Sequence, residues 1–190
     1  MNKIVLYGES YNIDIKELFL MNHNITTICP EIGKLTKLKR LDLYLNQINK
    51  ICPEIVELIN LERLYLSINK ITKICKDIGN LVNLRILDLI SNQLTEICKE
   101  IGNLVNLREL GLSNNKITII CKDIVNLVNL RGLYLDGNNI QNLTEIFQSI
   151  QYMRQLISVT ANTNDNIPLI NYIKRIYSRK YECFFCLYRL

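Results

Sequence analysis

Three groups of residues in this chain could do chemistry: a single histidine, a close cysteine pair and a set of evenly spaced cysteines. His23 is the only histidine, and an imidazole suits acid–base catalysis near neutral pH. Cys183 and Cys186 have the Cys-x-x-Cys spacing, which is half of a zinc or redox motif. No second half accompanies them, and neither a nucleophile–base pair nor a Gly-rich phosphate loop is present. The sequence therefore predicts no catalysis, no metal and no cofactor.

The evenly spaced cysteines recur every 23 residues, at Cys29, Cys52, Cys75, Cys98 and Cys121. Zinc needs about four ligands that converge, whereas a straight column points its sulfurs in parallel. The same parallel directions disfavour disulfides between neighbours. We therefore interpret the column as small buried hydrophobic side chains. The apolar residues Phe184 and Phe185 favour packing for Cys183 and Cys186 as well.

The same 23-residue period governs the apolar residues. Units begin at Ile15, Leu38, Leu61, Leu84, Leu107 and Leu130. With these residues as position 1, positions 1, 4, 6, 11, 14, 18 and 21 are apolar in nearly every unit. Positions 4 and 6 have the period of a short strand with one buried face, and the second half of each unit predicts a short helical or 3₁₀ turn. The result is an α/β solenoid, a horseshoe arc with a parallel sheet on its concave side.

A stack of such units needs protection at both ends, because each unit buries its apolar face on a neighbour. We expect six repeats over residues 15–152 and an N-terminal cap over residues 1–14, with residues 4–7 as an edge strand. Residues 153–190 are expected to form a degenerate seventh repeat, with Met153, Leu156 and Ser158 at positions 1, 4 and 6, followed by a capping helix that begins near Pro168 and a tail.

An asparagine follows each strand at position 9, and its amide could pair backbone groups that leave the sheet ladder. The column consists of Asn46, Asn69, Asn92, Asn115 and Asn138. His23 occupies this position in the first unit. We therefore interpret His23 as a terminal substitute for asparagine rather than as a catalytic base.

The units resemble leucine-rich repeats. They are similar to the 23-residue L-P-x-x-I-G-x-L-x-x-L units of the Ras-associated scaffold and of plant intracellular Ras-group-related proteins. The matching segments are 28–35 and 74–81, in which Cys29 and Cys75 stand where the family has proline, and Val56 and Val125 replace its glycine in other units. The resemblance implies a protein-interaction module without catalysis, and it does not imply a Ras-type partner.

Leucine-rich repeats generally bind with the concave sheet, here positions 2, 3, 5, 7 and 8. Exposed aromatic residues among Arg and Asp are typical of protein hot spots. The candidate partner-binding residues are Phe19, Tyr44, Tyr65, Ile68, Arg85, Asp88, Arg108, Arg131 and Tyr134. Leu45 adds apolar surface, and Arg154 ends the Arg column. The alternative is that these arginines only solvate one edge of the sheet and pair with acidic neighbours.

Composition bounds the partners. No apolar run is long enough for a membrane span, no secretory signal is visible, and no cysteine precedes Cys29, so we expect a cytoplasmic, reducing location. We expect an unknown protein partner and a monomer or weak self-association.

Most of the net charge of +5 lies in residues 166–190, which contain five basic residues and one acidic residue, Glu182. Nucleic-acid binding through the Arg column and this tail is one alternative, although Asp42, Asp88 and Asp136 share the predicted face. The other is an adaptor whose tail engages host machinery.

Overall fold

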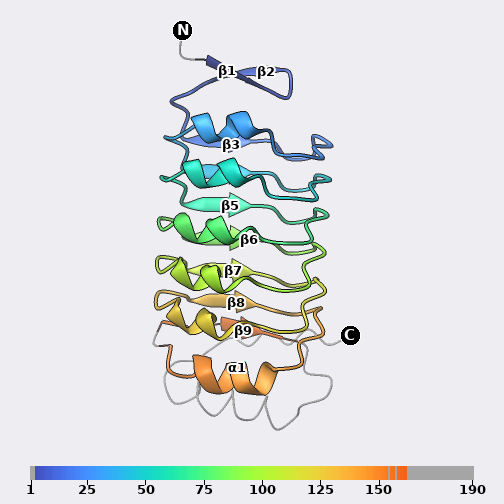
Figure 1. The fold of residues 1–190 in the computed structure, drawn as a ribbon, viewed down its shortest axis with the longest axis vertical. Coiled ribbons are helices and arrows are strands. Elements are labelled where there is room, and N and C mark those ends of the chain that lie inside the picture. The colour runs from blue at the N-terminus through green and yellow to red at the C-terminus, as the bar shows by residue number, and fades with distance from the viewer. Residues whose placement is uncertain (1–2, 154, 157, 162–190) are drawn as a thin grey trace.

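The strands of the molecule stack into one parallel sheet. A computed structural model describes residues 3–153, 155–156 and 158–161. Its main sheet has seven strands in sequential order: β3 (Glu17–Phe19), β4 (Arg40–Asp42), β5 (Arg63–Tyr65), β6 (Ile86–Asp88), β7 (Glu109–Gly111), β8 (Gly132–Tyr134) and β9 (Ser158–Thr160). Figure 1 shows the coils stacked as a column, with the helical turns drawn in front of the strands. The predicted solenoid with a parallel sheet is confirmed.

The buried residues follow the 23-residue period. Strands pair so that Leu41 lies beside Leu18 and Leu64, which places position 4 of each coil against position 4 of the next. In the fourth unit, six of the seven apolar positions have no exposed surface, and the remaining one, Ile97 at position 14, is 6% exposed. Apolar side chains from successive coils therefore form one continuous core, and each coil depends on its neighbours for burial.

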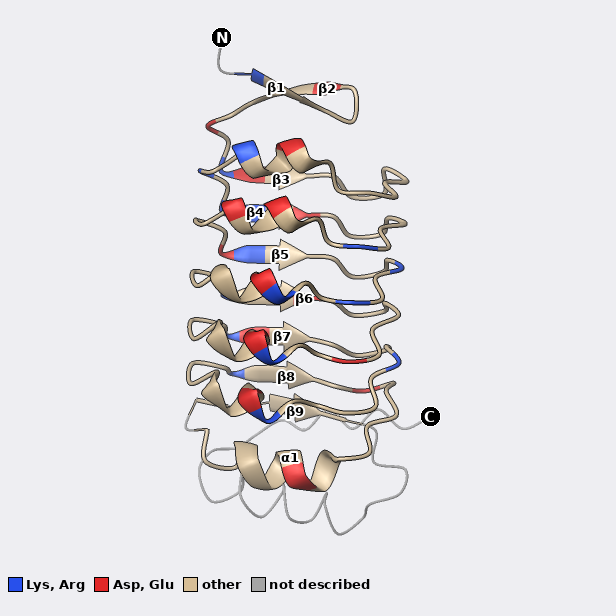
Figure 2. Ribbon diagram, viewed as in Figure 1, with Lys and Arg blue, Asp and Glu red and all other residues tan. Residues whose placement is uncertain are grey.

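Five short 3₁₀ turns lie opposite the strands, as predicted. They are η1 (Pro30–Lys34), η2 (Pro53–Glu57), η3 (Lys76–Asn80), η4 (Lys99–Asn103) and η5 (Lys122–Asn126). Each is closed by bonds between residues three apart, such as Ile32 N–H to the Cys29 carbonyl. Each also carries an acidic residue in its first turn, where partly positive amide groups are exposed. Figure 2 shows these residues as a red column along the turns.

Glycine at position 19 lets the turns of neighbouring coils approach closely. A Cβ at Gly102 would lie 2.6 Å from the Asp123 carbonyl oxygen of the next coil, closer than a carbon atom can approach. Gly33 and Gly79 face their next coils in the same way. Val56 and Val125 fill the position elsewhere, so the turns are not equally close along the stack.

The sixth coil is longer than predicted. Its outer segment is an α-helix, α1 (Leu143–Ile150), whose buried residues Ile146, Phe147 and Ile150 lie on one face. Strand β9 then pairs with β8 so that Ser158 lies opposite Gly132, which is position 3. The amide of Leu156 donates to the Met153 carbonyl, as position 1 does to position 21 in the preceding coils.

The predicted register of the seventh unit is therefore wrong by three residues. Leu156 occupies position 1 rather than position 4, and Val159 is the buried residue at position 4. The extra residues belong to α1, which replaces a five-residue 3₁₀ turn with an eight-residue helix. The same shift removes Arg154 from the Arg column, because position 2 of this unit falls on residue 157. Residues 154 and 157 lie outside the described part of the chain.

The N-terminal residues form a hairpin above the first coil (Figure 1). Strand β1 (Lys3–Leu6) pairs with β2 (Glu9–Asn12) in a separate two-stranded antiparallel sheet. The expected strand exists, but it does not extend the parallel sheet. Tyr7 and Gly8 form its turn with φ values of 51° and 86°, as a tight two-residue hairpin requires. The Tyr7 hydroxyl donates to the Thr27 carbonyl and accepts from Cys29 N–H, which fixes the hairpin to the first coil.

Residues 162–190, with the predicted helix near Pro168 and the Cys183–Cys186 pair, lie outside the described residues. In the part that is described, no helix has the length and apolar character needed to cross a membrane.

Candidate binding surfaces

The asparagines at position 9 bridge neighbouring coils. Asn92 Nδ2 donates to the Leu66 carbonyl of the preceding coil at 2.9 Å and to the Leu89 carbonyl of its own coil at 3.1 Å. Its Oδ1 accepts from Ile71 N–H of the preceding coil at 3.0 Å. Asn46, Asn69, Asn115 and Asn138 repeat this pattern. The side chain thus satisfies backbone groups that a bend in the chain leaves without partners.

His23 lies at the same place in the first coil and makes local contacts. Its Nδ1 lies 2.7 Å from the Met21 carbonyl oxygen, and its backbone N–H donates to Asn46 Oδ1. The ring is exposed at the end of the asparagine column. This arrangement suits a residue that ends the ladder, and it holds one ring nitrogen on the backbone.

The cysteine column points along the stack. Cys98 Sγ lies 3.9 Å from the Cys75 carbonyl oxygen, and Cys121 Sγ lies 3.7 Å from the Cys98 carbonyl oxygen. These two thiols thus face the backbone of the preceding coil. Burial raises the pKa of Cys52 and of Cys98 to about 11, so these thiols stay protonated near neutral pH.

All five cysteines of this column are free thiols. Among the described residues, no group of three or more His, Cys, Asp or Glu side chains is placed to hold a metal ion.

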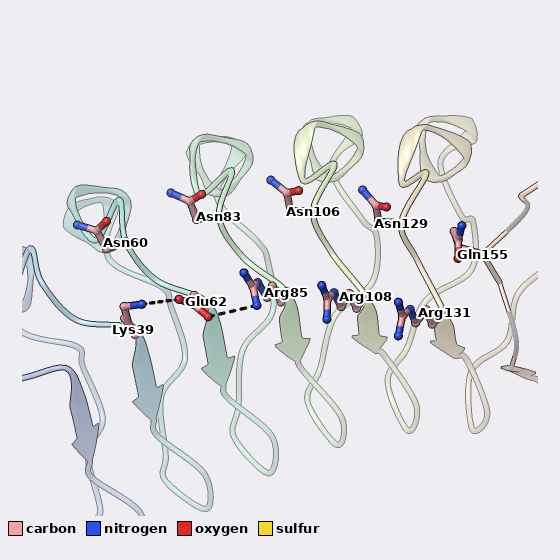
Figure 3. A pocket seen from close by; sticks show the side chains of 10 residues that line it. All are labelled: Lys39, Asn60, Glu62, Asn83, Arg85, Asn106, Arg108, Asn129, Arg131 and Gln155. Carbon is pink, nitrogen blue, oxygen red and sulfur yellow. Dashed lines mark hydrogen bonds and ion pairs between the residues drawn. The ribbon is translucent and has the colours of Figure 1, made fainter.

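The predicted partner-binding residues do not form one surface. Phe19, Tyr65, Asp88 and Tyr134 lie at position 5 and Tyr44 at position 7, on the outer side of the strands, which we call the sheet face. The arginines of position 2 lie where the chain enters each strand, on the edge near the 3₁₀ turns (Figure 3). Ile68, at position 8, lies just beyond the opposite end of its strand.

On the sheet face, an arginine that the sequence did not single out organises two of the aromatic rings. The Arg40 guanidinium carbon lies 5.0 Å from the Phe19 ring centroid and 4.8 Å from that of Tyr65, within the range of cation–π contacts. Arg40 also pairs with Asp42 at 3.1 Å. Position 3 could have revealed it, because alternation along a strand places positions 3 and 5 on the same side.

Two other candidates are engaged within the molecule. Asp88 accepts hydrogen bonds from the Ser67 hydroxyl at 2.8 Å and from Ile90 N–H at 3.1 Å. Tyr134 lies back over Gly132, where a Cβ would come 2.8 Å from the tyrosine hydroxyl oxygen. Burial, followed by the nearby Glu109 carboxylate, raises the pKa of Tyr134. Both residues therefore have structural partners, and Tyr44, with 39% of its surface exposed, is the more accessible side chain.

The backbone at position 8 is left-handed in all six coils, with φ between 52° and 67°. The residues are Asn22, Leu45, Ile68, Ser91, Asn114 and Gly137. Asparagine and glycine tolerate this conformation, whereas it is strained for leucine and more so for β-branched isoleucine. Leu45 and Ile68 are each 40% exposed, so burial in the fold does little to offset this strain.

Leu45 and Ile68 adjoin further exposed apolar side chains. Met21 and Tyr44 occupy position 7 of the first and second coils and are 44% and 39% exposed. The backbones of these coils are joined directly, since Asn22 N–H donates to the Tyr44 carbonyl. Met21, Tyr44, Leu45 and Ile68 are called the apolar patch below.

A polar groove of about 480 Å³ runs along the edge where the coils enter the strands. One wall is the charged row Lys39, Glu62, Arg85, Arg108 and Arg131, and the other is the amide row Asn60, Asn83, Asn106, Asn129 and Gln155. Figure 3 shows the amide side chains near the turns and the charged ones at the strand starts. Gln155 continues the amide row because of the shifted seventh register.

The amide row was not predicted, although its period is visible in the sequence at position 23. Each asparagine donates to a backbone carbonyl of the preceding coil, as Asn83 Nδ2 does to Ile59 at 2.8 Å and Asn106 Nδ2 does to Val82 at 2.9 Å. These residues are exposed, so their period alone does not distinguish them from other solvated positions.

Charge is unevenly distributed along the groove. Glu62 lies between Lys39 Nζ at 2.9 Å and Arg85 at 3.7 Å. The hydrogen bond from Lys39 is the main cause that lowers the pKa of Glu62. Among the described residues, no carboxylate forms an ion pair with Arg108 or Arg131. The single Glu62 carboxylate offsets one of its two neighbouring cations, so the groove is less positive toward its N-terminal end than toward its C-terminal end.

Comparison with known proteins identifies the repeat. A family model described as leucine-rich repeat matches residues 59–117 and 82–140. The chain is similar to a leucine-rich-repeat protein of Leptospira interrogans, with 37% identity over 77% of this chain and a TM-score of 0.72. It is also similar to internalin C2 of Listeria monocytogenes, with 29% identity over 73% of this chain and a TM-score of 0.64. No curated protein sequence matches.

A third similar structure is the plant peptide hormone receptor RGFR1 in complex with RGF2, with 30% identity over 80% of this chain and a TM-score of 0.69. The chain spans 37% of the Leptospira protein, 57% of internalin C2 and 25% of the plant receptor. These likenesses, together with the stacked coils and their asparagine ladder, show that the described part of the chain is a leucine-rich-repeat solenoid.

Proposed function

We propose that this chain is a protein-binding module that engages its partner through the sheet face and the adjoining apolar patch, without catalysis. The observation that carries the proposal is the strained and exposed pair Leu45 and Ile68, next to Tyr44. Backbone strain of about 1–3 kcal/mol per residue persists where the side chain serves a function. An exposed cluster of aliphatic and aromatic side chains supplies the area that protein hot spots bury.

The Phe19–Arg40–Tyr65 stack extends this surface. Because the cation–π contacts and the Asp42 ion pair hold Arg40 in place, little side-chain entropy is lost when a partner covers it. The plant receptor similar to this chain has been solved with the peptide hormone RGF2, which supports binding of a polypeptide by this fold. Arg85, Arg108 and Arg131 lie on the groove edge and are not needed for this proposal.

Several finer features belong to the same proposal. We place the chain in a reducing, cytoplasmic setting, supported by the free and packed thiols of the cysteine column, and we propose a monomer or weak self-association. The likeness to the Ras-associated, 23-residue class rests on the segments 28–35 and 74–81 alone. The adaptor alternative depends on the tail, which lies outside the described residues.

Affinity purification from the native cell, followed by mass spectrometry, tests the proposal. We expect the double substitution Tyr44→Ala/Ile68→Asn to lose specific partners that the wild-type chain recovers. A matched control, Tyr152→Ala/Ile119→Asn, changes an equally large exposed tyrosine and isoleucine away from the sheet face. Equal recovery of the same partners by both variants, with both folded, would count against the sheet face.

A further inference from the structure

The edge groove is a second surface, separate from the sheet face, and its charges are incompletely matched within the described residues. Arg108 and Arg131 occupy the same position in neighbouring coils, about 4.8 Å apart along the backbone. Like charges at this spacing repel each other. Glu62 lies between Lys39 and Arg85 at the other end of the groove, but no acidic side chain in the described part of the chain forms an ion pair with Arg108 or Arg131.

The amide wall supplies a different kind of group. Asn60, Asn83, Asn106 and Asn129 each commit Nδ2 to a backbone carbonyl. This fixes the orientation of the side chain, and no donor among the described residues reaches the Oδ1 atoms. The wall therefore offers fixed acceptors, which suit the N–H groups of a polypeptide and not the oxygen atoms of a phosphate backbone.

We propose that this groove binds an extended peptide segment of a partner protein that carries acidic side chains at one end. The carboxylates pair with Arg108 and Arg131, since guanidinium groups form strong charge-assisted bonds with carboxylates. Backbone N–H groups of the peptide donate to the amide row. Four coil spacings separate Asn60 from Gln155, about 19 Å in total, which an extended chain covers with about six residues.

The less positive end of the groove sets a preference for where the acidic residues lie. Glu62 lies in the groove between its two cations, so a peptide carboxylate near it would be attracted less than one near Arg108 and Arg131. Neutral polar residues are therefore expected over coils two and three, and acidic residues over coils five and six. The C-terminal tail of this chain is basic, so its charge does not match the Arg108–Arg131 pair.

Fluorescence anisotropy with the full chain at low ionic strength tests this proposal. The probe is a fluorescein-labelled heptapeptide with glutamates at one end and glycine and serine in the rest, and the same peptide with glutamine in place of glutamate is the neutral comparison. We expect the glutamate peptide to bind and the glutamine peptide to bind at least about tenfold more weakly. The substitution Arg108→Gln/Arg131→Gln should weaken binding of the glutamate peptide by about tenfold or more.

A matched control separates the groove from general charge attraction. Lys76→Gln/Lys99→Gln removes two exposed positive charges from the 3₁₀ turns and should change the dissociation constant less than twofold. Tyr44→Ala should also leave peptide binding unchanged, so that this proposal and the proposed function fail separately. Melting temperatures of all the variants confirm that they are folded.

Three results would overturn the proposal: no binding of the glutamate peptide, equal weakening by the groove and control variants, or no weakening by the groove variant. A single-stranded oligodeoxythymidine that binds more tightly than the peptide, with the same dependence on Arg108 and Arg131, would also overturn it in favour of nucleic acid. Such a complex would show the strong salt dependence of phosphate contacts.

Discussion

Side chains that recur with the same period in this molecule make different contacts. Asn92 and Asn106 both donate to a carbonyl of the preceding coil. Asn92 is buried and also bonds to its own coil, whereas Asn106 is exposed and makes one bond. The environment, not the residue type, decides the free energy that each contributes. A buried donor or acceptor left without a partner loses its hydration as well as its bond.

We expect Asn92→Ala to lower the free energy of unfolding by about 1–3 kcal/mol, because buried backbone groups of two coils lose their partner. Asn106→Ala should cost less, about 0.5 kcal/mol, because water can replace its single bond. Urea denaturation followed by circular dichroism measures both. Equal effects of the two substitutions would contradict this distinction.

At Ile68, in contrast, we expect a substitution to stabilise the fold. Ile68→Asn replaces a β-branched residue at φ 52° with one that tolerates this conformation, and the free energy of unfolding should rise by about 1 kcal/mol. The converse change, Ser91→Ile at φ 55°, should lower it by a similar amount. Thermal denaturation of the two variants checks the pair. Ile68→Asn should also weaken partner binding. A variant that is more stable but binds less would show that the strained isoleucine serves binding, whereas a poorly packed residue would affect stability alone.

At the scale of elements, close approach between neighbouring turns constrains the stack. Gly102→Ala places a methyl carbon 2.6 Å from the Asp123 carbonyl oxygen, and the turns η4 and η5 must separate. We expect a loss of about 1–3 kcal/mol, as for other overpacked sites. Val125→Ala, which shortens a side chain at the same position of the next coil, is the comparison for a change without a clash. A melting temperature for Gly102→Ala equal to the wild type would show that the turns separate at no cost.

The β1–β2 hairpin is the other element with a testable role, and we propose that it caps the first coil. Tyr7 is its principal polar link, with one bond to Thr27 and one from Cys29. Tyr7→Phe keeps the ring but removes both bonds, and should lower the free energy of unfolding by about 1 kcal/mol. Amide hydrogen exchange should show the loss of protection in the hairpin and first coil before the later coils. Uniform loss along the stack would argue against a cap.

Much of this architecture could be predicted from the sequence, because period and burial are linked. The residues from Leu84 to Leu104 mark the strand, the core and the turn without reference to any other part of the chain. The seventh register was missed because α1 adds three residues that the 23-residue period does not record. The positions of the candidate partner-binding residues were only partly predicted. The repeat pattern grouped the arginines of position 2 with the sheet residues, but the structure places them along the edge groove.

For the whole molecule, the partly buried cysteine column makes the free energy of unfolding depend on pH in the alkaline range. Burial raises the pKa of Cys52 and Cys98 to about 11, from about 8.5 in an unfolded chain. Between these values the unfolded chain has lost its thiol protons while the folded chain keeps them, so rising pH favours unfolding. We expect stability to fall as pH increases from about 9 to about 11. In the variant Cys52→Ala/Cys98→Ala, the free energy of unfolding should fall less between pH 7 and pH 11 than it does in the wild type. A fall as steep as that of the wild type would exclude these two thiols as its source.

The bridging asparagines also bear on how such a chain changes length. Each one bonds only to its own coil and to the one before it, so the segment from Leu84 to Asn106 could be excised as a whole. Asn115 would then meet the carbonyl of Leu66, and its Oδ1 would replace that of Asn92 as the acceptor for Ile71 N–H. Gene duplication or loss in steps of one complete coil would therefore leave an intact joint between coils, whereas extra residues, like the three in the sixth coil, are accommodated in the outer segment away from these bonds.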